Sequence, residues 1–400
     1  MKNRFMFCAI SAIALALAAA VPSFAQDAQQ QAAQLAAQQA EDLRLASQPC
    51  TPGPVPLPQR LQGAPWAETL KQGDYIVHDF QFHSAEILHE VKLHYYTLGA
   101  PQKDANGRVT NAVMIMHGTG GSGRGFLSAQ FAGVLFGPGQ LLDAHRYFII
   151  LPDGVGHGCS SKPSDGLHAR FPHYDYDDMV ALQHAVVTEA LGVNHLLLVM
   201  GTSMGCMHSW VWGETYPDFM DALVPLACQP LEIAGRNRIM RKMVTSAITS
   251  DPAWKNGEYT APIHGMQEAI DILLLMGSSP LQWQKNYPTR EKADAYLEQQ
   301  RKARIATTDA NDMLYYFDAS RNYNPDPNLE KIKARVLFIN SADDQINPPE
   351  LGIAEREITR VKDGRFVLLP ITDQTRGHGT HSLPAIWGSY LAELLHSLGR

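Results

Sequence analysis

The sequence predicts an α/β protein with a mostly parallel sheet of eight strands, flanking helices and an inserted block of helices. The first observation is a set of eight short runs patterned like strands, at residues 75–82, 90–96, 111–116, 146–151, 196–200, 222–226, 335–340 and 365–369. The second is that helical patterns, at residues 176–191, 349–358 and 383–398, alternate with the later runs. Such alternation favours a doubly wound parallel sheet.

The first two strands are expected to pair in an antiparallel manner. Residues 75–82 and 90–96 alternate apolar and polar side chains, which is typical of strands with one solvated face. Residues 196–200 instead form a nearly continuous apolar run, which indicates a strand buried on both faces of the sheet.

The alternation of strands and helices stops between residues 231 and 324. Helical patterns at residues 266–276 and 290–306 follow one another without an intervening strand, and the strand-like run at 335–340 comes afterwards. We expect a helical cap, inserted over the carboxyl-terminal edge of the sheet, between two parts of the core at residues 61–230 and 325–400. A chain of 400 residues is long for one domain, but α/β folds with insertions reach this size.

The N-terminus has the pattern of a secretory signal peptide. Lys2 and Arg4 precede an apolar run at residues 9–20, and the small side chains of Ser23 and Ala25 predict cleavage after Ala25. The run is too short to span a membrane, so we favour cleavage over an uncleaved anchor. Residues 26–60, rich in glutamine and alanine and then in proline, are expected to be a tether. We therefore expect a periplasmic or secreted protein without stable membrane insertion.

Composition excludes some classes of partner. Loss of Lys2 and Arg4 with the signal changes the formal net charge from −7 to −9, and the chain has no basic tract. An acidic chain of this kind argues against nucleic acid or an anionic membrane as partner.

Four cysteines remain after the signal, namely Cys50, Cys159, Cys206 and Cys228. An oxidising compartment permits disulfides, three complete pairings are possible, and a free buried thiol is the alternative for each. None has the spacing of a metal site, and we expect no metal and no cofactor.

A sharp turn that presents a serine is predicted after the strand at 196–200. Gly201-Thr202-Ser203-Met204-Gly205 fits the G-x-S-x-G pattern, in which small residues flank a serine because the turn into the following helix is tight. The turn places Ser203 at a helix N-terminus, where free backbone N–H groups favour negative charge. A chance match is the alternative, because the five-residue pattern is common.

A glycine cluster follows the strand at 111–116. The run from His117 to Gly123 lacks the lysine of a phosphate-binding loop, so we favour a role as an oxyanion loop. In that role the backbone N–H groups of Thr119 and Met204 would stabilise a developing oxyanion.

A general base and an orienting acid follow in the order that this kind of fold requires. Asp344 follows the strand ending at residue 340, and His378 follows the strand ending at residue 369, so the chain order is Ser203, Asp344, His378. Asp343 and His381 are close competitors. A turn residue and a solvated loop histidine are the alternatives without function.

From about Tyr95 to its C-terminus the chain resembles the homoserine O-acetyltransferase branch of the α/β-hydrolase superfamily. The resemblance is carried by the segments at residues 137–140, 146–148, 178–180, 203–207, 251–259 and 308–311, by the aspartate loop at 344–349, and by Gly377-His378. It implies the α/β-hydrolase fold, favours Asp344 over Asp343 and His378 over His381, and makes a homodimer an option.

The resemblance does not carry over to the acyl acceptor. Two arginines of the family, one of which grips the substrate carboxylate, align with Ile270 and Thr245 in this sequence, and a buried carboxylate would be left unpaired. An exported enzyme would also lack cytoplasmic acetyl-CoA. We therefore expect a serine hydrolase acting on a small acyl substrate with water as acceptor, although Arg124 or Arg236 could restore a cation near the pocket. The alternatives are an O-acyltransferase and a non-catalytic binding protein on the same scaffold.

Overall fold

The computed structural model describes Arg44, Gln48 and residues 50–400. The expected signal peptide and residues 26–43 of the expected tether lie outside the described residues. In the described part of the chain, no helix has both the length and the apolar character needed to cross a membrane.

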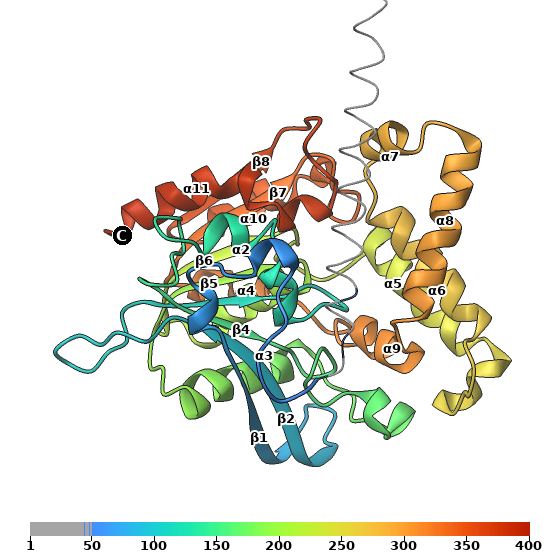
Figure 1. Ribbon diagram of the computed structural model, residues 1–400, viewed down its shortest axis with the longest axis horizontal. Coiled ribbons are helices and arrows are strands. Elements are labelled where there is room, and N and C mark those ends of the chain that lie inside the picture. The colour runs from blue at the N-terminus through green and yellow to red at the C-terminus, as the bar shows by residue number, and fades with distance from the viewer. Residues whose placement is uncertain (1–43, 45–47, 49) are drawn as a thin grey trace, which may run out of the picture. The chain divides into compact units, whose positions relative to one another are not determined.

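An eight-stranded sheet forms the centre of the fold, as the sequence predicts (Figure 1). The strand order is β1-β2-β4-β3-β5-β6-β7-β8, antiparallel at β1–β2 and β2–β4 and parallel between all later neighbours. The strands are β1 (Lys71–Gln81), β2 (Ile87–Leu98), β3 (Ala112–Met116), β4 (Phe148–Pro152), β5 (Leu196–Thr202), β6 (Met220–Leu226), β7 (Arg335–Ser341) and β8 (Gly364–Leu369). Because parallel strands end at the same edge, the loops after β3, β5, β7 and β8 meet there.

Helices cover both faces of the sheet. They are α2 (Ala132–Leu135), α3 (Tyr176–Ala185), α4 (Met204–Thr215), α10 (Ile353–Glu357) and α11 (Pro384–Ser397). One buried cluster packs α3, α4 and α10 against one face and includes Trp210, and another packs α2 and α11 against the other face and includes Trp387. Both indole rings are fully buried, so both faces of the central strands are covered, as expected for a parallel sheet.

A block of helices between β6 and β7 forms the cap, drawn in yellow and orange in Figure 1. Its helices are α5 (Gly235–Thr249), α6 (His264–Met276), α7 (Pro280–Asn286), α8 (Arg290–Ile305) and α9 (Ala310–Asp318). The cap has an apolar cluster of its own, which packs α5, α6 and α9 together. The Asp312 carboxylate on α9 accepts hydrogen bonds from the backbone N–H and the hydroxyl of Ser164, at 2.9 and 2.7 Å, and so links the cap to the core.

The end of the expected tether is fixed to the core. Cys50 forms a disulfide with Cys159, and Val55 and Leu57 pack against the buried cluster under α2 and α11. The side chain of Gln72 on β1 also donates hydrogen bonds to backbone carbonyls of this segment. Residues 50–60 therefore differ from the expectation of a tether, because their apolar side chains have a surface to bury.

Two expected helices are interrupted in the structure. The pattern at 349–358 becomes a 3₁₀ turn at Pro349–Leu351 and then α10, because Gly352 has a φ of 61° and breaks the helix. The pattern at 176–191 gives α3 followed by a π-helical turn at Val186–Ala190. The cysteines left open by the sequence form the pairs Cys50–Cys159 and Cys206–Cys228, rather than free thiols.

Candidate active site

Ser203 lies in the turn between β5 and α4, at the edge where the parallel strands end. Its backbone has a φ of 54° and a ψ of −108°, a conformation that costs a non-glycine residue about 1–3 kcal/mol. The Ser203 N–H donates to the carbonyl of Leu226 at the end of β6, at 2.8 Å, which helps to hold the turn in place. The hydroxyl is consequently presented at the N-terminus of α4.

Close backbone contacts explain why glycines flank the turn. A Cβ atom on Gly201 would lie 1.9 Å from the carbonyl oxygen of Gly205, and one on Gly205 would lie 2.2 Å from the carbonyl oxygen of Met116. These distances are far below van der Waals contact, so the sequence requirement of the turn is steric. The contact with Met116 also brings α4 against β3.

The structure brings the three predicted side chains into one hydrogen-bonded series. His378 Nε2 lies 2.8 Å from Ser203 Oγ, and His378 Nδ1 lies 2.9 Å from Asp344 Oδ2. A carboxylate can only accept, so Nδ1 carries the proton and Nε2 accepts from the hydroxyl. This tautomer lets Nε2 take the proton of Ser203.

Asp344 is held as a carboxylate by its surroundings. Its side chain is fully buried, and Oδ1 accepts the backbone N–H groups of Ile346 and Asn347 at 2.8 and 3.1 Å. Burial by itself raises the pKa of Asp344, but the charge of His378 and the hydrogen bonds from Asn347 outweigh it, so the pKa lies below its ordinary value.

Asp343, the competitor of Asp344, supports the histidine loop without touching the histidine ring. Its Oδ2 accepts the Gly377 N–H at 2.9 Å and the hydroxyl of Ser279 on the cap at 3.2 Å. It thereby joins the loop that carries His378 to the segment between α6 and α7.

His381, the competitor of His378, lies beside the series and not in it. Its ring centroid is 5.2 Å from that of His378. The pKa of His381 is lowered to about 3 because the ring is buried and His378 is close. Such a ring stays neutral and is poorly suited to accept a proton at neutral pH.

The loop after β3 lies against Ser203. A Cβ atom on Gly118 would lie 3.2 Å from Ser203 Cβ. The carbonyl of Gly118 accepts from His117 Nδ1 at 2.8 Å and from the Gly121 N–H at 3.0 Å, which fixes the peptide whose other end is the Thr119 N–H. In the described chain no acceptor binds the N–H groups of Thr119 and Met204.

His117 fixes this loop as a neutral ring. Its Nε2 accepts the Gly154 N–H at 3.0 Å, so the proton is on Nδ1, and burial lowers the pKa of the ring.

The cap approaches the same edge of the sheet with apolar and aromatic side chains. The apolar cluster of the cap extends to Ile346, two residues beyond Asp344. Tyr316 on α9 stacks on the buried His157 with ring centroids 4.1 Å apart, and a Cβ atom on Gly120 would lie 3.5 Å from the tyrosine ring. The cap therefore borders both the aspartate loop and the loop after β3.

The three predicted pocket residues have different surroundings in the structure. Ile270 is buried within the apolar cluster of the cap, and Thr245 is a partly exposed residue of α5 whose hydroxyl donates to the Lys242 carbonyl. Arg124, also predicted for the pocket, donates to the Pro56 carbonyl and the Gln48 side chain.

Two cations lie close to the aspartate and histidine loops. Arg236 donates to the carbonyl of Gln345, the residue after Asp344. Arg376 precedes His378 by two residues, is half-buried with a pKa lowered by burial, and forms no ion pair with any described residue. Sequence reasoning missed Arg376, Tyr316 and Ser279, and only Arg376 had a signal, its position beside His378.

Comparisons with known proteins agree with this fold. The model of the alpha/beta hydrolase fold family matches residues 111–367. A protein named "Probable acyltransferase" from Methanothermobacter thermautotrophicus is 28% identical over 285 residues, which cover 71% of this chain and 86% of that protein. A homoserine O-acetyltransferase from Haemophilus influenzae is 30% identical over 299 residues, covering 66% of this chain and 80% of the relative.

A solved structure shows the same fold at low identity. The crystal structure of esterase E22 superposes with a TM-score of 0.70 at 19% identity, covering 82% of this chain and 100% of that one. The family match spans more than half of the chain and the relatives include acyltransferases. The chain therefore belongs to the alpha/beta hydrolase fold family, as an enzyme of the hydrolase and acyltransferase type that is similar to homoserine O-acetyltransferases.

Proposed function

We propose that the protein moves an acyl group from an ester to an acceptor oxygen through an acyl-enzyme on Ser203. The observation that supports it is the series from Ser203 Oγ to His378 Nε2, at 2.8 Å, and from His378 Nδ1 to Asp344, at 2.9 Å. Ser203 Oγ attacks the acyl carbonyl carbon while His378 Nε2 takes its proton, and that proton then passes to the leaving oxygen. In the second half of the reaction the oxygen of the acceptor attacks the acyl-enzyme and its proton goes to His378 Nε2. The proton then returns to Ser203 Oγ as the new ester leaves.

The oxyanion of each tetrahedral intermediate would be bound by the N–H groups of Thr119 and Met204. Both amides lack acceptors in the described chain, and the peptide before Thr119 is held by His117. Met204 is the first residue of α4, so the helix N-terminus adds favourable charge. Losing one such donor typically costs about 10²–10³ in kcat.

An alcohol is the acceptor that we favour. The curated relatives are named as acyltransferases, and this outweighs the hydrolase that we expected from the sequence. Hydrolysis is the second candidate, and it is supported by the sequence, in which the neutral side chains of Thr245 and Ile270 stand where two arginines of the acetyltransferase family align. We therefore propose a neutral alcohol, and we expect homoserine to be a poor acceptor.

Export belongs to the same proposal. The first 25 residues have the pattern of a signal peptide, and the two cystines suit an oxidising compartment. N-terminal sequencing of protein recovered from the periplasm or medium should give a start near Gln26. Recovery of a chain that still begins at Met1 would count against cleavage.

The test follows both fates of one acyl-enzyme. A p-nitrophenyl acetate donor is given to the purified protein with water alone, with small neutral alcohols, or with homoserine. We expect p-nitrophenol release to rise with a neutral alcohol and the alcohol ester to accumulate. Hydrolysis unaffected by any alcohol would favour the hydrolase, and homoserine acetylation with the highest specificity constant would refute our interpretation of the cap.

Labelling separates both reactions from a binding protein that lacks catalysis. A fluorophosphonate should label the protein at Ser203 and should not label Ser203→Ala. Failure of the wild-type protein to react would support the non-catalytic alternative.

A further inference from the structure

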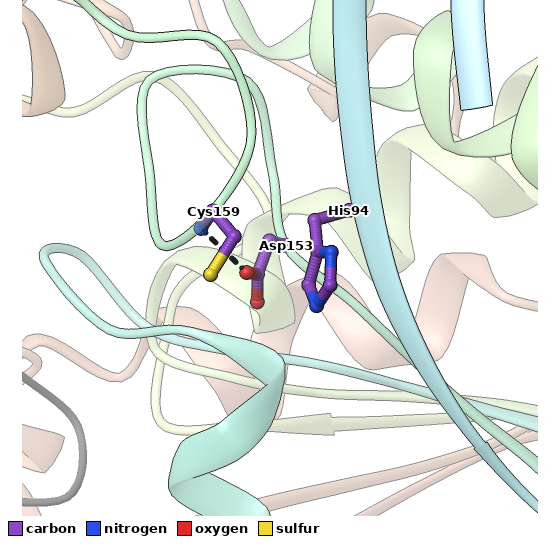
Figure 2. A group of neighbouring side chains, drawn as sticks. All are labelled: His94, Asp153 and Cys159. Atoms are coloured by element: carbon purple, nitrogen blue, oxygen red, sulfur yellow. Dashed lines mark hydrogen bonds between the residues drawn. The ribbon is translucent and has the colours of Figure 1, made fainter. Parts of the chain in front are cut away.

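A second group of reactive side chains lies outside the candidate active site. His94 on β2, Asp153 at the end of β4 and Cys159 in the following loop each point a ligand atom into the same space (Figure 2). The imidazole nitrogen, carboxylate oxygen and sulfur atoms all lie within 4.8 Å of one another. None of the three belongs to the series that includes Ser203.

His94 is arranged as metal-binding histidines are. Its Nδ1 is bonded to Asp74 Oδ1 at 2.7 Å, and its side chain is 7% exposed. The other nitrogen, Nε2, is buried and has no hydrogen-bond partner among the described residues. Metal-bound histidines usually donate one ring N–H to a carboxylate, a backbone carbonyl or a water, and bind the metal with the other nitrogen. An isolated buried nitrogen lacks the hydrogen bond that a satisfied core histidine would have.

Asp153 supplies a buried carboxylate with spare lone pairs. It is 2% exposed, and its two oxygens accept the backbone N–H groups of Gly123 and Cys159 at 2.7 and 2.8 Å. Each oxygen retains a lone pair, and a divalent cation would neutralise a charge that is otherwise costly to bury.

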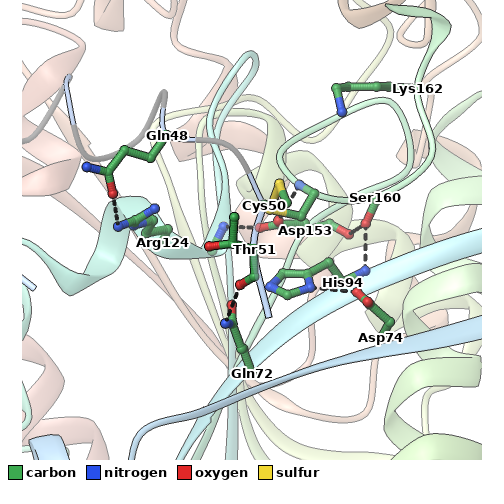
Figure 3. Close-up of a disulfide and its surroundings, with 12 residues drawn as sticks. Gln48, Cys50, Thr51, Gln72, Asp74, His94, Arg124, Asp153, Ser160 and Lys162 are labelled. Atoms are coloured by element: carbon green, nitrogen blue, oxygen red, sulfur yellow. Dashed lines mark hydrogen bonds and ion pairs between the residues drawn. A yellow bond between two sulfur atoms is a disulfide. The ribbon is translucent and has the colours of Figure 1, made fainter. Parts of the chain in front are cut away.

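The sulfur of Cys159 is engaged in the disulfide with Cys50 (Figure 3). Cys50 is an exposed residue, which favours access of a reductant to the disulfide. The segment that carries Cys50 is also held by Gln72, which donates to the carbonyls of Thr51 and Gly53 at 3.1 and 2.7 Å. These bonds keep the Cys50 thiol close to the other ligands after the disulfide opens.

We propose that reduction of the Cys50–Cys159 disulfide creates a zinc site formed by His94 Nε2, the Asp153 carboxylate and the two cysteine sulfurs. A small dithiol gives two electrons and two protons to the disulfide and becomes a cyclic disulfide itself, leaving two protein thiols. Zn²⁺ then binds both sulfurs and two thiol protons go to solvent. Imidazole nitrogen, carboxylate oxygen and thiolate sulfur are all ligand atoms that bind Zn²⁺, and four of them complete a tetrahedral site.

The required movement is small. Zinc bonds of about 2.0–2.3 Å place tetrahedral ligands about 3.3–3.7 Å apart, so the group must contract by about 1 Å. Opening the disulfide frees the sulfur positions for this. In the oxidised protein the two sulfurs are bonded to each other, so neither is a thiolate that can bind zinc, and the site forms only after reduction. The N-terminal segment is then linked to the core by the disulfide in the oxidised protein and by the zinc ion in the reduced protein.

The test uses the full chain, oxidised and after treatment with dithiothreitol that is then removed without air. Titration with Co²⁺ should give thiolate charge-transfer absorption only in the reduced protein, saturating at one equivalent, and Zn²⁺ should displace it. Zinc should also protect Cys50 and Cys159 from alkylation. Asp74→Asn, which releases the fixed nitrogen of His94, should weaken binding by about 10- to 100-fold, and His94→Gln should weaken it more.

Two control variants test whether metal binding depends on the proposed histidine and disulfide. His89→Gln changes an exposed β2 histidine that is also paired with a carboxylate, Asp79, and should leave binding unchanged. The double variant Cys206→Ser, Cys228→Ser removes the other disulfide and should also bind normally.

Cys50→Ser covers the case in which His94→Gln fails to fold. It leaves the Cys159 thiol reduced without any reductant and should bind Co²⁺ more weakly than the reduced wild-type protein. The proposal is overturned if the oxidised protein binds equally well, if the reduced protein does not bind, or if neither His94→Gln nor Cys159→Ser weakens binding.

Discussion

Replacing Asp344 with asparagine should trap His378 in the wrong tautomer. Asp344 Oδ1 accepts two backbone N–H groups, from Ile346 and Asn347, so the asparagine oxygen would take that side. The amide NH₂ would then face His378 Nδ1, where Oδ2 now lies at 2.9 Å. Nδ1 would become an acceptor, the ring proton would move to Nε2, and Nε2 could no longer take the proton of Ser203.

The size of the effect follows from the cost of flipping the amide. To restore the active tautomer, the asparagine must turn its NH₂ toward the two backbone N–H groups and leave both without an acceptor. The flip returns an acceptor to the Asn347 side chain, which donates to Oδ2 at 3.1 Å, so the net loss is one hydrogen bond, at about 1–3 kcal/mol. At about 1.36 kcal/mol per decade, kcat should fall by about 5-fold to 160-fold. The same change in the serine protease triad costs about 10⁴-fold.

The assay is steady-state p-nitrophenyl acetate turnover, with circular dichroism to show that each variant folds. Asp343→Asn is the matched control, since Asp343 accepts from the Gly377 N–H and from two hydroxyls and does not touch His378. Because hydroxyls can reverse their hydrogen bonds, it should lose less than about tenfold, or about 1 kcal/mol. A larger loss in Asp343→Asn than in Asp344→Asn would refute the assignment.

Three further outcomes can be measured. Ser203→Gly should be more stable to urea than Ser203→Ala by about 1 kcal/mol, because glycine tolerates the φ of 54° without strain, and equal stabilities would contradict this. Gly118→Ala should lower kcat by about 10²-fold with little change in KM, because the added Cβ would crowd Ser203 and displace the Thr119 N–H. An unchanged kcat would argue against the oxyanion role of this loop. Burial raises the pKa of Asp312 to about 7 in the folded protein, whereas an unfolded aspartate releases its proton near pH 3.8. Between these two pH values the folded state binds more protons, so the free energy of unfolding should fall as the pH rises. Asp312→Asn should remove this pH dependence, and an equal slope in both proteins would contradict the cause.

Features that depend on local sterics could be predicted from the sequence. The turn at Ser203 was predictable because Gly201 and Gly205 are required by contacts within the turn itself and with the neighbouring strand. The eight strands and the cap were predictable because their apolar patterns extend over whole elements. The order of Ser203, Asp344 and His378 followed from the strands that precede each residue.

Features that depend on contacts between distant residues could not be predicted in this way. The Cys50–Cys159 disulfide closes a separation of 109 residues, and the sequence favoured no pairing. Asp343 and Asp344 follow the same strand, and their roles differ because their side chains point in different directions. Asp344 binds the ring of His378, and Asp343 binds the Gly377 N–H.

The surroundings of the predicted pocket residues also depend on contacts between distant residues. The burial of Ile270 within the cap and the hydrogen bonds from Arg124 to residues before β1 follow from tertiary packing, which a position in the sequence does not give.

The position of the cap in the chain has a consequence for how enzymes of this kind diverge. The five cap helices form one continuous insertion between β6 and β7, which are neighbours in the sheet. Ser203 precedes this insertion in the chain, and Asp344 and His378 follow it. Substitutions or insertions in the cap, or exchange of the whole cap, can therefore change the substrate specificity while the residues that transfer the proton stay the same. A grafted cap would also have to replace the contacts that this cap makes with the loops of the site, among them the hydrogen bond from the Ser279 hydroxyl to Asp343 under the histidine loop.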